Sequence, residues 1–532
     1  MNSTPAQPIL EKTISKAALK VALGGGISLV AGLAAQMIIA YLFGAGAEMD
    51  AFYTSATIPY FLQISLLSWL PFIMIPAFVN EETAGHIEDA WSLVRLFFIL
   101  TGSVLTVIAL VCAFFSPQII SVVVPGFSET KAANASAMLV IQIFSLPFIG
   151  LATFTAAVEN ARSRFFWPAA ATAIGSTGNL LCVILLHSSI GILALPWGAL
   201  VSTLCQCLVT TIPVLRHGWT KSVGWRDPRF VEMLRLSVPF IVFGLIISSR
   251  SLLERYFASS LPDGQLSYIG YANKISNIFV VLLASSIASA IFPTMARNYA
   301  RKGLSGLTQL TDHGLRLTLA TALPTLAITS ALATPLVTIL YQRGAFDLQA
   351  TQAVCIIVPV VLFGDLLLRM IGNIIVQAFY ILKDTLTANI VFSATIIIYI
   401  IAAIILVNQL GYIGLALAQP VQGIVSVTIL CVIIFNRLKP YPSAEFVRSI
   451  LLFGTLSLGA ALTAWAVIQL LNKTPVLLQL AAGAASAATL YMVVLNLVNP
   501  SMAQSIMDMT GLSRSVDFIR THFIRLNETR KP

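Results

Sequence analysis

The chain has 532 residues, of which 58% are hydrophobic and only 10% are charged, and its formal net charge is +10. This composition leaves no room for a soluble domain beyond short loops and a tail of about 33 residues. It predicts an integral membrane protein throughout. We interpret the positive charge as a signal of membrane orientation with some attraction to anionic lipids, and it gives no case for nucleic-acid binding.

Fourteen apolar stretches follow one another along the chain. A membrane-spanning helix needs roughly 20 apolar residues. The stretches show no alternation of polar and apolar residues, which favours helices over a transmembrane barrel. The predicted fold class is all-α, a polytopic membrane protein of about 14 transmembrane helices, with approximate spans 18–43, 51–79, 90–115, 134–158, 165–187, 190–215, 236–260, 267–296, 314–341, 350–380, 385–408, 411–436, 447–471 and 476–498.

A weak internal repeat suggests two related halves. Phe43 and Phe257 correspond at an offset of 214 residues, and Pro76 and Pro293 at an offset of 217. Six helices per half is an even number, so the halves would share orientation and be related by an axis along the membrane normal. The predicted organisation is a cytoplasmic N-terminal arm (1–17), an N-terminal six-helix lobe (18–215), a basic cytoplasmic linker (216–235), a C-terminal six-helix lobe (236–436), an accessory helix pair (447–498) and a cytoplasmic basic tail (499–532).

Lysines and arginines predict the orientation, because short loops rich in them stay in the cytoplasm. Of 31 such residues, about 24 lie in the N-terminal arm, the even-numbered loops and the C-terminal tail. Only Lys131, Arg343 and Lys473 fall on the other side. Both termini are therefore predicted to face the cytoplasm. The one exception to this charge bias is an acidic loop that carries Glu81, Glu82, Glu88 and Asp89.

Several kinds of chemistry lack a signature in the sequence. All six cysteines lie within apolar spans, so we expect neither disulfides nor a metal site. No GxxxxGK[ST] loop occurs, so ATP is not expected to drive the protein directly. We expect no cofactor, and coupling to an ion gradient, to the membrane potential or to consumption of the product outside. The five histidines are scattered and no large outer loop holds paired carboxylates, which argues against a membrane-embedded glycan enzyme.

Three segments carry a family resemblance. FGAGAEMDAFYTSATIP (43–59), YQRGAFD (341–347) and QAFYILKDTLTA (377–388) resemble hallmarks of the MurJ/MviN family, with ENARSRFFWP (159–168) and Asn179 as weaker support. That family belongs to the multidrug/oligosaccharidyl-lipid/polysaccharide exporter superfamily. Its best-known members flip lipid II, the undecaprenyl-diphosphate-linked precursor of peptidoglycan, in the bacterial inner membrane. The resemblance implies two six-helix lobes, a final helix pair lining a lipid groove, and a lipid-linked oligosaccharide substrate among membrane lipids. It names no protein partner.

A flippase for such a substrate needs a hydrated cationic cavity, because neither the diphosphate nor the sugar crosses hydrocarbon unaided. Charges at mid-membrane cost roughly 2.5 kcal/mol or more each, so they are functional candidates. We assign diphosphate binding to Lys274, Arg255 and Arg250. Lys274, in GYANKIS, matches a position where the family carries a cavity arginine. The candidates for cavity charge pairs or coupling are Glu254, Asp365, Arg369 and Asp50.

Structural interpretations of the same charges stay open. Arg250 and Glu254 are four residues apart, as are Asp365 and Arg369, so each pair can neutralise itself on one helix face. Lys274 can instead extend to the outer interface.

The sequence also departs from the family pattern. Where lipid II flippases carry further cavity arginines, this chain has Leu29, Ala35, Gln63 and Ile64. An exporter of lipid-linked exopolysaccharide or O-antigen repeat units is therefore an alternative to a lipid II flippase. A cation-coupled multidrug exporter is a further alternative.

Overall fold

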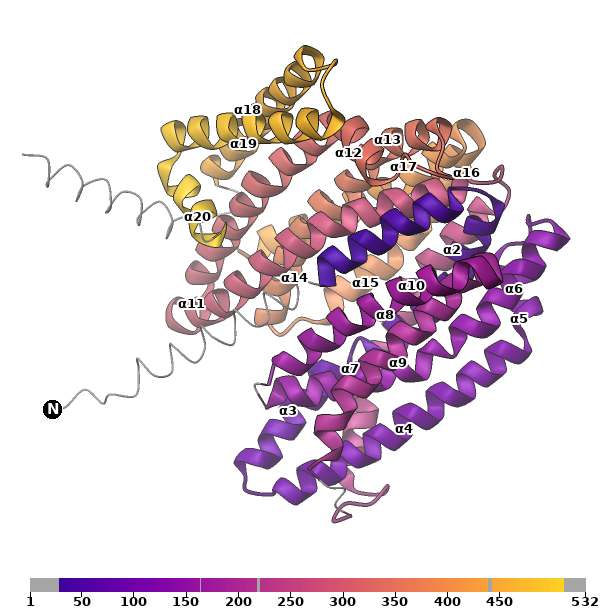
Figure 1. Cartoon of the computed structure of the whole chain (residues 1–532). Helices are drawn as coiled ribbons and strands as arrows, with labels where there is room; N and C mark the ends of the chain where they lie inside the picture. The colour runs from indigo at the N-terminus through magenta and orange to yellow at the C-terminus, as the bar shows by residue number, and fades with distance from the viewer. Residues whose placement is uncertain (1–27, 163, 218–220, 439–442, 511–532) are drawn as a thin grey trace, which may run out of the picture. The chain divides into compact units, whose positions relative to one another are not determined.

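The computed structural model describes residues 28–162, 164–217, 221–438 and 443–510, without the side chains of 284–286, 288–290 and 509–510. These residues form helices and contain no strand (Figure 1), so the predicted all-α fold is confirmed. The predicted arm at 1–17 lies outside the described residues. Of the predicted tail, only the part up to residue 510 is described, and it forms the helix α20.

Eleven helices in the described part are long and apolar enough to cross a membrane, or twelve if a pair bent by 73° at Ala331–Ala333 is one span. The predicted count of fourteen is therefore not confirmed. Two places account for part of the difference. The helix Ser28–Phe43 is short, and the stretch Phe166–Leu215 is continuous although it contains two helices that pack against each other. Gly191, with φ of 58°, lies at the turn between those two helices.

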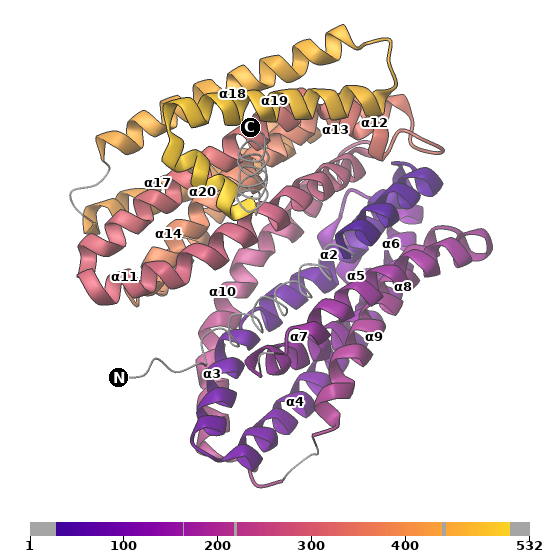
Figure 2. The ribbon, with the colours of Figure 1, turned by 60° about the vertical axis from the view of Figure 1, so that its left-hand side comes forward.

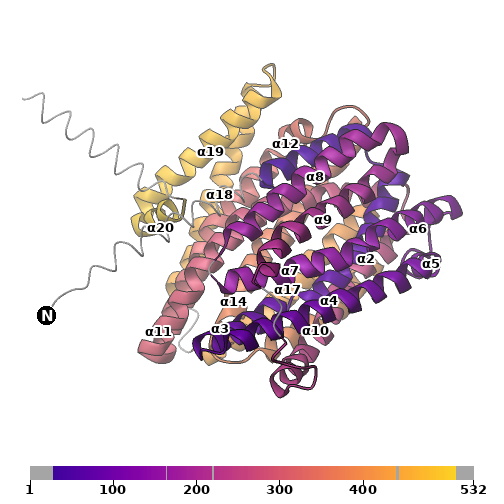
Figure 3. The same ribbon diagram turned by 60° about the horizontal axis from the view of Figure 1, so that its bottom comes forward.

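The chain divides into two compact units. The first contains the residues up to Ser267 together with Arg343–Asp347. In it α2 packs against α6 and α10, and α7 and α9 lie side by side (Figure 3). Its helices are Ser28–Phe43, α2 (Ala47–Leu67), α3 (Leu70–Thr83), α4 (Ile87–Phe114), α5 (Ser116–Val123), α6 (Glu129–Ile143), α7 (Ser145–Ala161), α8 (Phe166–Ile190), α9 (Ala194–Leu215) and α10 (Pro228–Ala258), with a 3-10 turn at Gly191–Leu193.

The second unit contains residues 268–342 and those from Leu348 onward. Here α16 packs on α17, and α18 lies beside α19 (Figure 2). Gly303, at φ of 63°, breaks the long α11, since glycine adopts this left-handed backbone without strain. The elements are α11 (Gln265–Ala331, its first turn in the first unit), α12 (Ala333–Leu340), α13 (Leu348–Leu362), the π-helix η2 (Phe363–Leu368), α14 (Arg369–Ile381), α15 (Leu386–Ala394), α16 (Ile396–Leu410), α17 (Tyr412–Arg437), α18 (Ala444–Leu470), α19 (Val476–Val498) and α20 (Pro500–Thr510).

Packing places α10 in the first unit because α10 crosses α2 closely. A Cβ on Gly244 of α10 would lie 2.9 Å from the carbonyl oxygen of Ser65, so only glycine permits this approach. The packing units thus divide after Ser267, whereas the predicted lobes divide within 216–235. The predicted lobes rest on an internal repeat rather than on packing, and they stay a prediction.

Candidate substrate and coupling site

Asp50 is a buried carboxylate of the first unit that accepts several hydrogen bonds. It lies in the first turn of α2 and is only 1% exposed. Its carboxylate accepts hydrogen bonds from the backbone N–H groups of Gly264 and Ser267, each at 2.8 Å, and from the Ser267 hydroxyl. Because α11 begins at Gln265, Asp50 satisfies N–H groups that the first turn of α11 leaves unpaired. The carboxylate therefore caps α11 from a neighbouring helix.

Lys131 supplies the positive charge that balances Asp50. Its Nζ lies 2.9 Å from Asp50 Oδ2 and 2.7 Å from Asp263 Oδ1, and 4.2 Å from the ring centroid of Phe127. The side chain is 7% exposed, whereas Asp263 is 67% exposed. The sequence indicated only that Lys131 is a cation of an outer loop, because no local pattern predicts its pairing with Asp50, which is 81 residues away. We call Asp50, Lys131, Asp263 and Ser267 the Asp50 cluster.

Arg255 is anchored to α2. Its Nε donates a 2.8 Å hydrogen bond to the hydroxyl of Thr57, which donates to the carbonyl of Tyr53. Its Nη1 lies 3.4 Å from Glu254 Oε1, and both residues are 9% exposed. Glu254 thus pairs with its chain neighbour Arg255, a partner that the helical spacing of Arg250 and Glu254 did not suggest.

Asp365 and Arg369 form the other predicted pair, in the second unit. Arg369 Nη2 lies 2.8 Å from Asp365 Oδ1, and Gln419 Nε2 of α17 donates to the same oxygen at 2.6 Å. Asp365 lies within the π-helix η2. Such segments are rare and are often found at functional sites. Sequence reasoning missed Gln419, because the π-helix and its packing on α17 leave no local signal.

Lys274 is exposed on α11 in the second unit, whereas Arg250 and Arg255 belong to the first. Their convergence in one cavity therefore stays a prediction. All four positions that lack the family's arginines lie in the described part of the first unit, and Leu29 and Ile64 are partly exposed there. Ala35 is 4% exposed within the core, and Gln63 is partly exposed.

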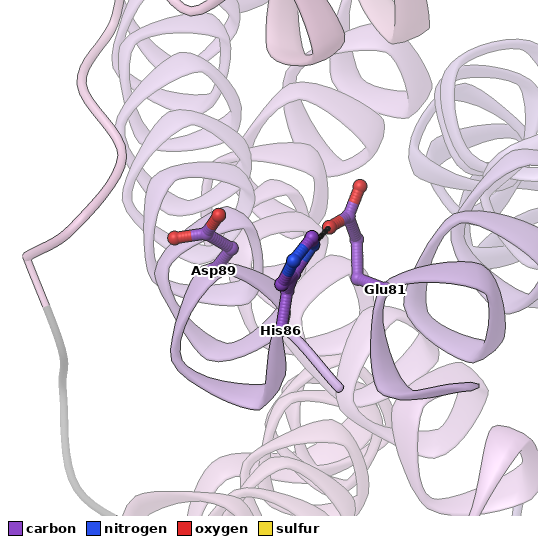
Figure 4. A group of neighbouring side chains, drawn as sticks. All are labelled: Glu81, His86 and Asp89. Carbon is purple, nitrogen blue, oxygen red and sulfur yellow. Dashed lines mark ion pairs between the residues drawn. The ribbon is translucent and has the colours of Figure 1, made fainter. Parts of the chain in front are cut away.

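The acidic loop between α3 and α4 gathers three potential metal ligands, shown in Figure 4. Ligand atoms of Glu81, His86 and Asp89 lie within 4.8 Å of one another, and His86 lies 3.6 Å from Glu81. Arg229, at the start of α10, forms ion pairs with two of these residues, because its Nη1 lies 2.9 Å from Glu81 and 3.0 Å from Asp89. Bidentate hydrogen bonds from the same guanidinium also hold the pKa of Asp227 below its usual range. The acidic loop is thus the counter-ion of Arg229.

An apolar cavity of about 500 Å³ lies in the second unit, lined by α11, α12, α19 and α20. At one wall the Tyr491 hydroxyl donates a 2.7 Å hydrogen bond to the carbonyl of Ala320. The resemblance implied a lipid groove lined by the accessory pair at 447–498. In the structure α19 lines the cavity but α18 does not. The lining of the cavity also includes Leu332, Leu336, Ala484 and Ile506.

Two of the family-like motifs touch each other within the first unit. The N–H of Ala345 donates a 2.9 Å hydrogen bond to the carbonyl of Tyr41. Gly44 and Gly344 both have positive φ, and a Cβ on either would lie 2.3 Å from a backbone oxygen of the opposite segment. Gly44 of FGAG and Gly344 of RGAFD are thus required by a close backbone approach.

The third motif, QAFYILKDTLTA, is a helix stop followed by a helix start. Lys383 has φ of 60°, and the N–H of Asp384 bonds to the carbonyl of Phe379 at 2.9 Å, a Schellman ending of α14. Asp384 then accepts from the N–H and hydroxyl of Thr387 in the first turn of α15 and from Arg437 at 2.7 Å.

These helices have the fold of a known class of membrane exporters. An inward-facing multidrug resistance transporter of the MATE family of the MOP superfamily matches with a TM-score of 0.66 at 14% identity, covering 80% of this chain and 100% of that chain. A lipid II flippase MurJ in an inward closed conformation matches with a TM-score of 0.74 at 22% identity, covering 90% of this chain and 99% of that chain. The chain is thus a polytopic helical membrane protein with the fold of these transporters.

Sequence comparison identifies the family. The model of the family described as "Lipid II flippase MurJ" matches residues 39–482, and the chain belongs to this family. A probable lipid II flippase MurJ of Vibrio cholerae is 25% identical over 446 residues, covering 79% of this chain and 84% of the relative. The lipid II flippase MurJ of Burkholderia cenocepacia is 24% identical over 462 residues, covering 83% and 88%. The family is one of transporters, so the chain is not an enzyme.

Proposed function

We propose that this protein flips lipid II from the inner to the outer leaflet of the bacterial inner membrane by alternating access. The observation that carries the proposal is the match of the lipid II flippase family model to residues 39–482, together with relatives described as a probable lipid II flippase and a lipid II flippase. The apolar helices agree with a multi-pass membrane protein. The distribution of lysines and arginines supports placing both termini in the cytoplasm.

Arg250, Arg255 and Lys274 are the proposed ligands of the diphosphate. Arg255 supports this role, because Thr57 and Glu254 hold its guanidinium in one orientation while leaving other N–H donors for a ligand. Lys274 is exposed and can present its ammonium to a polar headgroup. A lysine keeps the charge of the family's arginine but loses bidentate phosphate geometry.

The apolar cavity between α11, α12, α19 and α20 is the proposed site for part of the polyprenyl chain. Its volume of about 500 Å³ and its Leu, Ala, Ile and Phe lining fit a hydrocarbon segment rather than a sugar. The same unit carries the pair Asp365 and Arg369, which we propose as the coupling element. Asp365 is only 14% exposed and lies in a π-helix, a rare type of segment that is often found at functional sites.

Genetic complementation tests the proposed function. The resident lipid II flippase of a bacterium is depleted, this chain is expressed, and survival is scored with the accessibility of lipid II at the outer face. Rescue is expected. Failure with normal membrane expression would contradict lipid II as cargo and would favour another lipid-linked saccharide, as Leu29, Ala35 and Gln63 in place of cavity arginines suggested.

Variants of Lys274 test the proposed diphosphate site in the same strain. Lys274→Ala should abolish rescue with normal membrane expression, whereas Lys274→Arg, which restores the family's residue, should retain it. Lys302→Ala, at an exposed lysine of the same helix, is the matched control and should behave as the wild type. Full rescue by Lys274→Ala would exclude Lys274 from substrate binding.

A further inference from the structure

Two arginines and a histidine meet where α7 and α9 end. Nη1 of Arg162 lies 2.6 Å from Nε2 of His217, and Nη1 of Arg164 lies 3.3 Å from the same nitrogen. The imidazole stacks on Trp91 with ring centroids 4.9 Å apart and planes at 16°. Both guanidiniums can donate to Nε2 only while that nitrogen carries no proton. We call Arg162, Arg164 and His217 the basic cluster.

The two arginines differ in how their charges are balanced. Arg162 lies 3.8 Å from Glu159, which is fully buried, and it also feels the charge of Glu82. Arg164 is exposed and contacts His217, and its charge also acts on Glu159, but among the described residues no carboxylate lies within ion-pair distance of its guanidinium. A guanidinium has five N–H donors, so most of those of Arg164 are directed to the surroundings. Arg164 therefore presents a positive charge with unused donors.

Aromatic residues place this cluster at the level of the membrane interface. Phe165 and Phe166 directly follow Arg164, are 42% and 51% exposed, and begin α8. Trp167 follows them in the first turn of α8 and is partly exposed, and tryptophan side chains at helix ends are typical of the headgroup region of a bilayer. The phosphate groups of lipids lie at the same depth, and arginine recognises phosphate through paired hydrogen bonds.

We propose that Arg164 and His217 form a binding site for a phosphate group, supplied by an anionic lipid headgroup, with Arg162 and Trp91 as positioning residues. The site is separate from the proposed diphosphate ligands and does not depend on which saccharide is carried. When the phosphate binds, His217 turns from accepting the arginine hydrogen bonds to donating one to the anion, so binding takes up a proton.

The direction of the pH dependence follows from the surroundings of His217. Burial and the charges of Arg162 and Arg164 lower the pKa of His217, so the imidazole is neutral at neutral pH. A bound phosphate offsets the two guanidiniums and raises that pKa toward its ordinary value. Affinity for phosphate should therefore increase as pH falls from about 8 to about 6.

The test uses the full chain purified in a neutral detergent and measures binding of dihexanoyl phosphatidic acid by the shift in melting temperature. Arg164→Gln should weaken binding at least tenfold while leaving the melting temperature without lipid unchanged. Arg226→Gln, at an exposed loop arginine of the same unit, is the matched control and should bind as the wild type. His217→Gln should lose the gain in affinity that the wild type shows as pH falls from about 8 to about 6, and should keep only the pH dependence that ionisation of the phosphate monoester itself gives to every variant.

Two further probes identify the source of the phosphate group. Dihexanoyl phosphatidylcholine, whose phosphate is masked by choline, should not stabilise the protein. Inorganic phosphate stabilising the protein as well as phosphatidic acid does, with the same loss in Arg164→Gln, would support the site but assign it to a soluble ligand. Equal binding of phosphatidic acid by Arg164→Gln and the wild type would overturn the proposal.

Discussion

Buried charges in this protein serve two purposes that the sequence does not separate. The cost of placing a charge in the membrane singled out both Asp50 and Arg255 as functional candidates. In the structure the Asp50 carboxylate caps α11 and forms an ion pair with Lys131. Arg255 donates one hydrogen bond to Thr57, and its guanidinium keeps further N–H donors for a ligand. Which purpose a charge serves depends on partners distant in sequence, and these could not be predicted from local patterns.

The Asp50 cluster should lose stability when its cation is removed. Lys131→Met leaves Asp50 buried without its counter-charge, and breaking such a buried pair typically costs about 3 kcal/mol. We therefore expect a clearly lower melting temperature in detergent. Lys473→Met, at an exposed lysine between α18 and α19, is the control and should be neutral. Equal melting temperatures for both variants would show that Asp50 does not need Lys131.

At the scale of helices, the sequence predicted the elements better than their ends. Apolar composition is sufficient to predict the helical class, which the described residues confirm. It did not predict the π-helix at Phe363–Leu368 or the break at Gly303, because both depend on packing rather than on composition. The turn at Asp384 caps α15 through the bonds that Thr387 donates to the Asp384 carboxylate.

The cap of α15 makes a specific prediction for acid stability. Hydrogen bonds from Thr387, and then from Arg437, lower the pKa of Asp384 to about 2. Its pKa in the unfolded chain is about 3.9. A lowered pKa stabilises the fold fully above the unfolded value, and this contribution is lost as pH falls from about 4 through about 2.

We therefore expect the wild type to lose more stability than Asp384→Asn over this pH range, measured by thermal unfolding at each pH. Asp508→Asn, at an exposed carboxylate of α20, should retain the wild-type dependence on pH. Parallel curves for the wild type and Asp384→Asn would exclude Asp384 as the source.

The contact of the FGAG and RGAFD segments predicts an asymmetry between two glycine substitutions. Gly44→Ala combines a left-handed backbone with a Cβ 2.3 Å from the carbonyl oxygen of Ala345. Gly191→Ala has a similar φ of 58°, but no atom lies within 4 Å of its Cβ. A positive φ strains alanine at both positions, and Gly44→Ala adds the clash with Ala345, so it should destabilise more than Gly191→Ala in thermal unfolding. Equal losses would mean that the two segments separate without cost.

At the scale of the whole molecule, the sequence predicted the fold class and the family, and the packing units differ from the lobes it suggested. The repeat at 214–217 residues placed α10 at the start of the second lobe. Packing places α10 in the first unit because Gly244 permits close contact with Ser65. A single glycine in an apolar span does not predict which helix packs against it. The site residues predicted for one cavity fall in both units and stay a prediction.

Filling the apolar cavity should impair transport without unfolding the protein. Ala484→Trp introduces an indole among Leu332, Leu336 and Ile506, where we propose that the polyprenyl chain lies. Ala485→Trp is the matched control, because Ala485 is exposed and does not line the cavity. We expect Ala484→Trp to reduce complementation strongly and Ala485→Trp to preserve it, at equal membrane expression. Normal complementation by Ala484→Trp would exclude this cavity as the chain site.

The segment Arg343–Asp347 packs in the first unit, although the residues on both sides of it belong to the second. No single cut can therefore divide this chain into two self-sufficient fragments. A fragment ending at Ser267 would lack the N–H of Ala345 that pairs with Tyr41, and the surface around Gly44 would be uncovered. Reassembly of the transporter from two separately translated pieces should improve when a peptide of residues 341–348 is appended to the first piece.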